Sequence, residues 1–358
     1  MTYGPPETVP AWAQDIVPTD SVPIDGNGPS SADAVNLATG AEEHTPDPDI
    51  VVRNPNGPKV VYARQYRSTL ASVGMYAPGL SPGWTDNYNV YLDRTTPYTT
   101  GTWGKYLLTY PNSARELLTP VLDASGNPTG QLTAPSGAPY AASGSPKQGQ
   151  PGQWNSFTLT FKDGSTWTFV PSSTANRYYL YQIADLLYPN NTAYHTIRLI
   201  RDTNAANNNR IDHIEDAAGN VLLRFSYLNG YLSALMDVAA SNDADKRQVN
   251  YTFGTTPTTA GVTCLLEVDQ IAPYLGSASA RWIYDYKAAP NGQPLLNFVK
   301  VPDPNQGSSP PSHPINYDEA ARVSSLVDAR GNQRVYSYSS GATKVEIKKS
   351  SGQIVESW

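Results

Sequence analysis

The sequence predicts an all-β protein: an extended antiparallel sheet built of hairpins and curled or partly rolled into a shell. Composition is the first reason, because the 358 residues include 24 Tyr, and Tyr favours strands. The 31 Pro and 27 Gly interrupt almost every segment and leave little room for long helices. Finally, hydrophobic side chains alternate with polar ones in many short runs that end at turn residues, which is the pattern of half-buried strands.

Composition divides the chain into four regions. Residues 1–33 form a proline-rich arm whose few apolar side chains suit either a linker or a clasp on another subunit. Residues 34–122 form an N-terminal module of short strands separated by sharp turns. Residues 123–152 are rich in Gly, Pro and Ser and have almost no bulky side chains, so we expect a long surface loop. Residues 153–358 form an array of β-hairpins.

The array begins with a clear hairpin, because hydrophobic side chains alternate on both sides of Asp163 and Gly164. An aromatic-x-aromatic step then recurs at irregular spacing, which favours strand pairs joined by loops of different length over a strict solenoid. Such rings either stack in rows within the core or form a platform for sugars, and we expect the core role. The steps are Trp167/Phe169, Phe225/Tyr227, Tyr251/Phe253, Tyr284/Tyr286 and Tyr336/Tyr338.

The most complete run of strands and turns lies between residues 211 and 237. Its hydrophobic side chains alternate from 221 to 227, so they would share one face of a strand. Asn229-Gly230 then suits a two-residue type I′ hairpin. Part of this text recurs at 328–338, which indicates a duplicated structural unit. The residues that define the two copies are Asp216, Gly219, Asn220, Phe225, Tyr227, Gly230 and Asp237, and then Asp328, Gly331, Asn332, Tyr336 and Tyr338.

Two parts of the chain resemble the Rhs/YD-repeat protein family. VNLATG, NPNG, RQYRS and GLSPGWTDNY, in that order, resemble the N-terminal module of these proteins. The two copies described above resemble YD repeats, in which Asp-x-x-Gly-Asn/Arg precedes an aromatic strand, Gly-x-Leu and another Asp. The resemblance covers about residues 34 to 93 and 197 to 358. The residues that carry the module motifs are Gly40, Asn54, Pro55, Asn56, Gly57, Gly83, Trp84, Asn87 and Tyr88.

The resemblance implies architecture more than chemistry. Rhs-type carriers form a large β-shell around a C-terminal toxin, and related YD-repeat proteins at cell surfaces serve in adhesion, some of them binding carbohydrate. This sequence contains no toxin domain, and it is too short for the full shell. Its last residues lie inside another repeat, which suits a piece of a longer array or a unit completed by a neighbour.

Charge and cysteine content exclude several kinds of partner and site. The net charge of −6 and the scattered basic residues argue against nucleic acid binding. Cys264 is the only cysteine, so there is no intramolecular disulfide and no multi-cysteine zinc site; we expect a small buried side chain. We also expect no membrane span, and the N-terminus lacks the order of a signal peptide.

No catalytic, cofactor-binding or metal-binding residue is predicted. The histidines, His44, His195, His213 and His313, stand apart from other strong ligands, and no nucleophile elbow, P-loop or dinucleotide motif occurs. The Asp residues beside Gly or Ala are expected to bond the turn backbone. One hypothesis remains for a metal: residues 202–216 are rich in oxygen ligands and could hold Ca²⁺, although they lack the EF-hand order.

The sequence therefore favours a non-enzymatic structural or adhesive module of a cell-surface or extracellular YD-repeat protein. Its expected partners are copies of itself or the rest of a longer repeat array, since free sheet edges invite pairing and self-assembly. One alternative is the N-terminal part of a toxin-encapsulating Rhs shell. Another is a carbohydrate-binding surface protein that holds polysaccharide on exposed Tyr and Trp.

Overall fold

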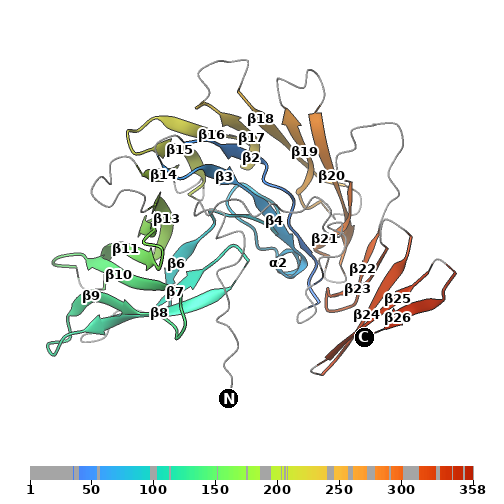
Figure 1. Cartoon of the computed structure of the whole chain (residues 1–358), viewed down its shortest axis with the longest axis horizontal. Coiled ribbons are helices and arrows are strands. Elements are labelled where there is room, and N and C mark those ends of the chain that lie inside the picture. Colours follow the sequence, from blue (N-terminus) through green and yellow to red (C-terminus); the bar gives the residue numbers. More distant parts are fainter. Residues whose placement is uncertain are drawn as a thin grey trace.

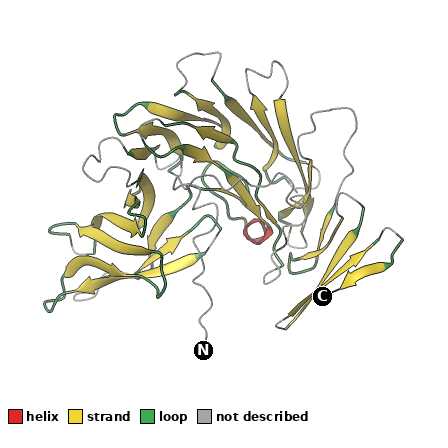
Figure 2. Ribbon diagram, viewed as in Figure 1, coloured by secondary structure: helices red, strands yellow, loops and turns green. Residues whose placement is uncertain are grey.

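The computed structural model confirms the all-β prediction: strands dominate, and the only helix described is one short turn. Figure 2 shows this distribution. Within the described part of the chain, no helix has the length and apolar character needed to cross a membrane. The residues that the structure describes are 35, 40–54, 57–96, 103–112, 114–150, 152–174, 176–185, 195–202, 204, 207, 209–239, 246–256, 261–271, 279–289, 292–300, 314–327, 331–340, 342–349 and 351–357.

Residues 40–90, which we call the inner module, form two small sheets and a helical turn. One sheet has the strand order β1-β4-β5 and the other pairs β2 with β3. The elements are β1 (Glu43–His44), β2 (Ile50–Val52), β3 (Val60–Tyr62), β4 (Arg64–Arg67), α2 (Ser68–Ser72) and β5 (Trp84–Asp86).

The next eight strands close into a ring. Strand β13 pairs with β12 along one side, while on the other side its first residues, 177–179, pair with β6. Consecutive antiparallel pairs join the strands between β6 and β12, so the circuit has no free edge. The strands are β6 (Tyr91–Arg94), β7 (Tyr106–Thr109), β8 (Arg115–Leu122), β9 (Pro128–Thr133), β10 (Tyr140–Pro146), β11 (Trp154–Phe161), β12 (Thr166–Pro171) and β13 (Arg177–Ala184).

The ring corrects the prediction of a surface loop at 123–152, because this range contributes β9 and β10 to the wall. These strands carry small residues because the neighbouring strand fills the interior with large rings. A Cβ at Gly144 would lie 2.6 Å from the Trp154 ring and 3.0 Å from Phe157. The ring also takes β6 to β8 from the range predicted as the N-terminal module, so the architecture divides nearer residue 90 than residue 122.

From β13 the sheet continues outside the ring as a curved array of antiparallel hairpins. Residues 182–184 of β13 pair with β14, and each later strand pairs with its successor up to β21. The rolled, hairpin-built sheet is therefore confirmed. The strands are β14 (Thr196–Arg201), β15 (Ile211–Asp216), β16 (Val221–Leu228), β17 (Tyr231–Asp237), β18 (Gln248–Gly254), β19 (Cys264–Ile271), β20 (Ser279–Ala288) and β21 (Pro294–Lys300).

A separate five-stranded sheet follows, in the simple order β22 to β26. It adjoins the end of the curved array, where the Tyr317 hydroxyl donates to the Leu296 carbonyl at 2.8 Å. Its strands are β22 (Ile315–Tyr317), β23 (Val323–Val327), β24 (Gln333–Ser339), β25 (Ala342–Lys348) and β26 (Ile354–Ser357).

Candidate functional site

The inner module lies on the concave side of the curved array (Figure 1), where β2 to β4 and α2 sit beneath the arch of β14 to β21. Main-chain groups of the array reach it directly. The Leu232 amide donates to the Gly79 carbonyl at 2.7 Å, and the Leu265 amide donates to the Ser81 hydroxyl at 2.9 Å. The Leu296 amide donates to the Tyr66 hydroxyl at 2.9 Å. Three strands of the array, β17, β19 and β21, thus hold the module by hydrogen bonds.

A fully buried ion pair lies at the centre of this contact. The Arg64 guanidinium binds the Asp49 carboxylate with Nε–Oδ2 at 2.5 Å and Nη2–Oδ1 at 2.9 Å, and neither side chain is exposed. The array supplies the remaining partners: the Tyr251 hydroxyl donates to Asp49 at 2.7 Å, and Arg64 donates to the Tyr284 hydroxyl at 3.0 Å. Burial opposes the charge on Arg64, but the Asp49 carboxylate together with the Tyr284 and Tyr251 hydroxyls outweighs burial and raises the Arg64 pKa.

Aromatic rings enclose the ion pair. The Arg64 guanidinium lies 4.9 Å from the centre of the Trp84 ring, within the range of a cation–π interaction. Trp84 itself is fully buried and donates through Nε1 to the Tyr286 hydroxyl at 2.9 Å. That hydroxyl donates in turn to the Leu265 carbonyl at 2.7 Å, so the polar groups of Trp84 and Tyr286 are both satisfied.

His44 lies in the same cluster and makes edge-on contacts with two aromatic rings. Its ring centre is 6.0 Å from that of Trp84 and 5.8 Å from that of Tyr284. Burial and then the charge of Arg64 lower the His44 pKa to about 3. His44 is therefore a neutral core residue at physiological pH.

The remaining module motifs hold the backbone of β3 and β4. The Asn87 side chain accepts from the Ala63 amide at 3.0 Å and donates to the Val61 carbonyl at 2.8 Å. The Tyr88 hydroxyl accepts from the Val61 amide at 3.2 Å. Gly83 has φ +85°, and a Cβ there would lie 2.3 Å from the Tyr66 ring, which explains glycine before Trp84.

The NPNG motif of the module, residues 54–57, is only partly described. Asn54 is buried, and a Cβ at Gly57 would lie 2.8 Å from its side-chain nitrogen and 3.2 Å from the Thr196 amide. Glycine at 57 thus allows the turn to approach the start of β14. Pro55 and Asn56 lie outside the described residues.

The first repeat copy contacts the module through Tyr227. Its hydroxyl donates to the Ile211 carbonyl at 2.8 Å, and the Arg210 guanidinium lies 4.4 Å from the ring centre. Gly79 of the module presses against the ring: it has φ +86°, and a Cβ there would lie 2.6 Å from Tyr227 Cε1. Phe225, on the same strand, makes an edge-on ring contact with Tyr62 at 5.4 Å between centres.

The second copy repeats this arrangement at Tyr338. Its hydroxyl donates to the Val323 carbonyl at 2.6 Å, and the Arg322 guanidinium lies 4.4 Å from the ring centre. Gly40 takes the place of Gly79, with a prospective Cβ 2.9 Å from Tyr338 and a carbonyl that accepts from the Val323 amide at 2.8 Å. The two glycines of the module therefore meet the equivalent tyrosines of the two copies.

The turn residues of the copies have structural roles. Asp216 accepts from the Ala218 and Asn220 amides at 2.9 and 2.8 Å, while Gly219 between them has φ +87°. Asp318 makes the same turn, accepting from the Ala320 and Arg322 amides at 2.9 and 3.0 Å. Asp318 precedes Arg322 as Asp202 precedes Arg210, so it lies one turn before Asp328, the predicted equivalent of Asp216, which is outside the described residues.

The remaining predicted repeat residues lie in turns or in the core. Asn229 and Gly230 both have positive φ, 52° and 92°, and join Leu228 to Tyr231 in the expected type I′ hairpin. Asp237 pairs with Arg247 at 2.7 Å, linking β17 to the start of β18. Tyr336 is buried, while Gly331 and Asn332 lead into β24.

No group of described residues has the ligand cluster of a metal site. No three His, Cys, Asp or Glu side chains in the described part converge around a point. His195 lies 3.2 Å from Asp185, and His213 lies 2.6 Å from Asp212 and 3.6 Å from Glu215. In the proposed calcium stretch, Asp202 accepts from the Asn204 amide at 2.9 Å, which is a turn contact. His313 lies outside the described residues.

Burial supports the core role for most rings of the aromatic steps, while Tyr227, Phe253 and Tyr338 are partly exposed. Trp167, Phe169, Tyr284 and Tyr286 are at most 2% exposed, so they form the core and offer no platform to a sugar. Cys264 is likewise fully buried, as expected, and burial raises its thiol pKa to about 12.

No protein-family model matches the sequence, and neither does any curated protein. Three solved structures show partial likeness. The N-terminal domain of effector protein SpvB from Salmonella typhimurium is 13% identical, covers 71% of this chain and 98% of that chain, and has a TM-score of 0.35. The TcdB2-TccC3-TEV crystal structure is 12% identical and covers 89% of this chain but 17% of that chain, with a TM-score of 0.31. A porin-like protein from Bacteroides uniformis is 9% identical and covers 76% of this chain and 97% of that chain, with a TM-score of 0.29. Membership of the Rhs/YD-repeat family stays a prediction.

Proposed function

We propose that this chain is a non-enzymatic structural module that closes one end of a β-hairpin array and offers the other end for extension. The observation that carries the proposal is the difference between the ring, where the hairpin series begins, and the separate five-stranded sheet, where it ends. At one end β13 closes the ring, so none of the strands β6 to β12 has an unpaired edge. Closure of this kind is how natural sheets avoid unwanted pairing.

The opposite end has an open edge. Among the described strands, β26 pairs only with β25, through residues 354–357. Its Ile354 and Val355 side chains are 51% and 48% exposed. An exposed apolar edge strand is a template for another strand, and edges that proteins protect carry Lys or Pro instead. The next strand would come from further repeats or from a second copy.

The inner module is the second feature that supports the proposal. It covers the concave face of the array with a buried ion pair and aromatic rings, so this face holds no cargo. Terminal units of repeat arrays need such a cover, because their last hydrophobic face has no neighbouring repeat. In a toxin-encapsulating shell, the chain would form the closed end. We place that shell at the cell surface or outside the cell.

Sedimentation velocity across a concentration series tests the open edge. The double variant Ile354→Lys/Val355→Lys places two charges on β26, and Gln353→Lys adds the same charge in the adjacent turn as a control. We expect concentration-dependent association of the native chain and of Gln353→Lys, and at least a tenfold weaker association of the double variant. Hydrogen exchange of the 354–357 amides shows whether β26 is formed. The proposal is rejected if these amides exchange slowly and the native chain is nevertheless strictly monomeric.

A further inference from the structure

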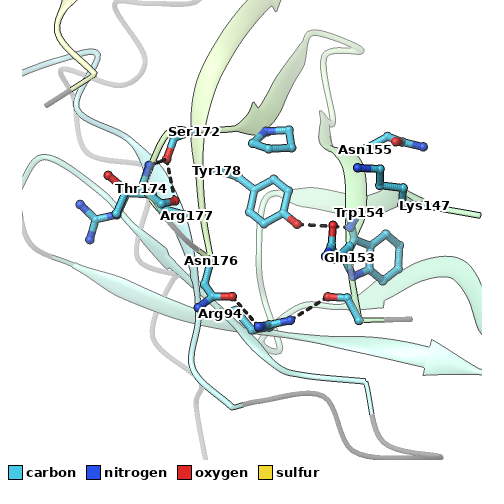
Figure 3. A pocket seen from close by; sticks show the side chains of 12 residues that line it. Arg94, Lys147, Gln153, Trp154, Asn155, Ser172, Thr174, Asn176, Arg177 and Tyr178 are labelled. Atoms are coloured by element: carbon cyan, nitrogen blue, oxygen red, sulfur yellow. Dashed lines mark hydrogen bonds between the residues drawn. The ribbon is translucent and has the colours of Figure 1, made fainter. Parts of the chain in front are cut away.

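A polar pocket of about 360 Å³ opens at one end of the ring (Figure 3). It lies where the end of β6, the start of β11 and the connection from β12 to β13 come together. These segments share one end of the ring, because Arg177 of β13 faces Asp93 of β6, and Phe157 of β11 faces Phe169 of β12. The volume is at the lower end of the range for small-molecule sites, about 300–1,000 Å³, and suits a ligand the size of one sugar.

Arg94 is fixed in place at the pocket wall. It donates through Nη1 to the Gly152 carbonyl at 2.9 Å and through Nη2 to the Asn176 side-chain oxygen. Asn176 adopts φ +65°, a conformation that residues other than glycine rarely take. Such local strain is found where the surrounding structure holds a side chain in a required position. Arginine has five N–H donors, so these two bonds leave others for a ligand.

The pocket carries unneutralised positive charge. No carboxylate oxygen lies within 4.0 Å of Arg94 or Lys147 among the described residues. Arg177, by contrast, points away from the middle of the pocket and pairs with Asp93 at 2.7 Å. The chain as a whole has a net charge of −6, so two free cations on one pocket mark a local site for an anion.

The rest of the lining fits hydroxyl groups better than apolar surfaces. Gln153, Asn155 and Thr174 are exposed at the rim and carry amide and hydroxyl groups. Of these, the Thr174 hydroxyl already accepts from Asn209 at 3.1 Å, and the Asn155 amide donates to the Pro146 carbonyl at 3.5 Å. Trp154 and Tyr178 form the floor, but they are only 1% and 7% exposed, and the Tyr178 hydroxyl accepts from the Trp154 amide at 3.2 Å. The two rings therefore close the bottom of the pocket, and neither exposes a face on which a sugar ring could stack.

We propose that this pocket binds an acidic sugar residue, a hydroxylated ring that carries a carboxylate. The carboxylate binds between Arg94 and Lys147, and the ring hydroxyls bind the amide and hydroxyl groups of the rim. Polar side chains of this kind distinguish a sugar from a simple anion, because a phosphate ion has no ring hydroxyls to satisfy them. The pocket lies on the ring, away from β26, so binding is independent of the association at that edge.

Titration of the whole chain with glucuronate, glucose and inorganic phosphate, followed by amide chemical shifts, tests the proposal. We expect glucuronate to bind at least tenfold more tightly than either of the others and to shift the signals of Gln153 and Asn155. Lys147→Gln should weaken glucuronate binding about fivefold, as loss of one exposed charged hydrogen bond does, and Arg94→Lys should weaken it further. Lys162→Gln is the matched control, because Lys162 is exposed at the opposite end of the ring.

Several results would overturn the proposal. Equal affinity for glucose would remove the role of the cations, and equal affinity for phosphate would leave a simple anion site. Absence of binding to all three ligands would also reject the pocket, as would an equal effect of Lys147→Gln and Lys162→Gln. Lys147 is exposed and its side chain holds no described contact, so its variant should keep the native melting temperature.

Discussion

Replacing Arg64 with Met should cost about 3–5 kcal/mol of unfolding free energy, because removal of one partner leaves the buried Asp49 carboxylate without its counter-charge. That is a large part of the roughly 5–15 kcal/mol that stabilises a typical protein. Arg177→Met is a matched control: its pair with Asp93 also has two hydrogen bonds, both of 2.7 Å, but the side chains are 28% and 36% exposed. Exposed pairs contribute about 0–1 kcal/mol.

The double variant Arg64→Met/Asp49→Leu separates charge from packing. An apolar pair of similar volume often replaces a buried ion pair at little cost, so part of the stability should return. It should not return fully, because the Tyr251 and Tyr284 hydroxyls lose their partners, at about 1–3 kcal/mol each. Urea denaturation followed by Trp fluorescence measures the four proteins. The reasoning is refuted if Arg64→Met costs no more than Arg177→Met, or if the double variant is less stable than Arg64→Met alone.

Three further predictions concern the same contact. Gly79→Ala should cost about 1–3 kcal/mol more than Gly219→Ala in urea denaturation, because both have positive φ but only position 79 meets a ring; equal costs would contradict the clash. His44, with a pKa of about 3, binds its proton less well folded than unfolded, so stability falls as pH drops below about 6.5, by about 2 kcal/mol at pH 5. The urea midpoint of His44→Leu should not show this loss at low pH. The prediction is refuted if the midpoint of His44→Leu changes with pH as steeply as that of the native chain. Asp86 has the opposite sign: burial raises its pKa to about 6, so its protonation stabilises the fold as pH falls from about 6 towards 4. Asp86→Asn should therefore lose more stability than the native chain between pH 7 and 5, and an equal loss would count against the Asp86 assignment.

Local patterns in the sequence predicted the hairpins well. Asn229-Gly230 specifies its own turn through two residues that accept positive φ, so nothing distant is needed. The same holds for the alternation around Asp163 and Gly164, where β11 pairs with β12. The strand β10 was missed because Ala142 and Gly144 carry no hydrophobic signal; their small size has meaning only beside Trp154 of the next strand.

The contacts that define the candidate site are not local. Asp49 and Arg64 find Tyr251 and Tyr284 about 200 residues later, and no periodicity in the sequence links them. Ring closure depends on β13 meeting β6 across the whole circuit. One signal was available: Arg210 precedes Ile211 just as Arg322 precedes Val323, at nearly the same distance before Tyr227 and Tyr338. Extending the comparison of the two copies backwards would have found the Arg–Tyr contact.

Strand β13 belongs to the ring and to the curved array at once, since its first residues pair with β6 and its last with β14. Rotation of the ring against the array would therefore have to break main-chain hydrogen bonds between β13 and its neighbours. A flexible linker would have permitted the rotation without that cost. Force applied to the array is therefore passed to the closed ring, which has no unpaired edge strand that could be pulled away first. The ring and the array are thus joined through one continuous strand.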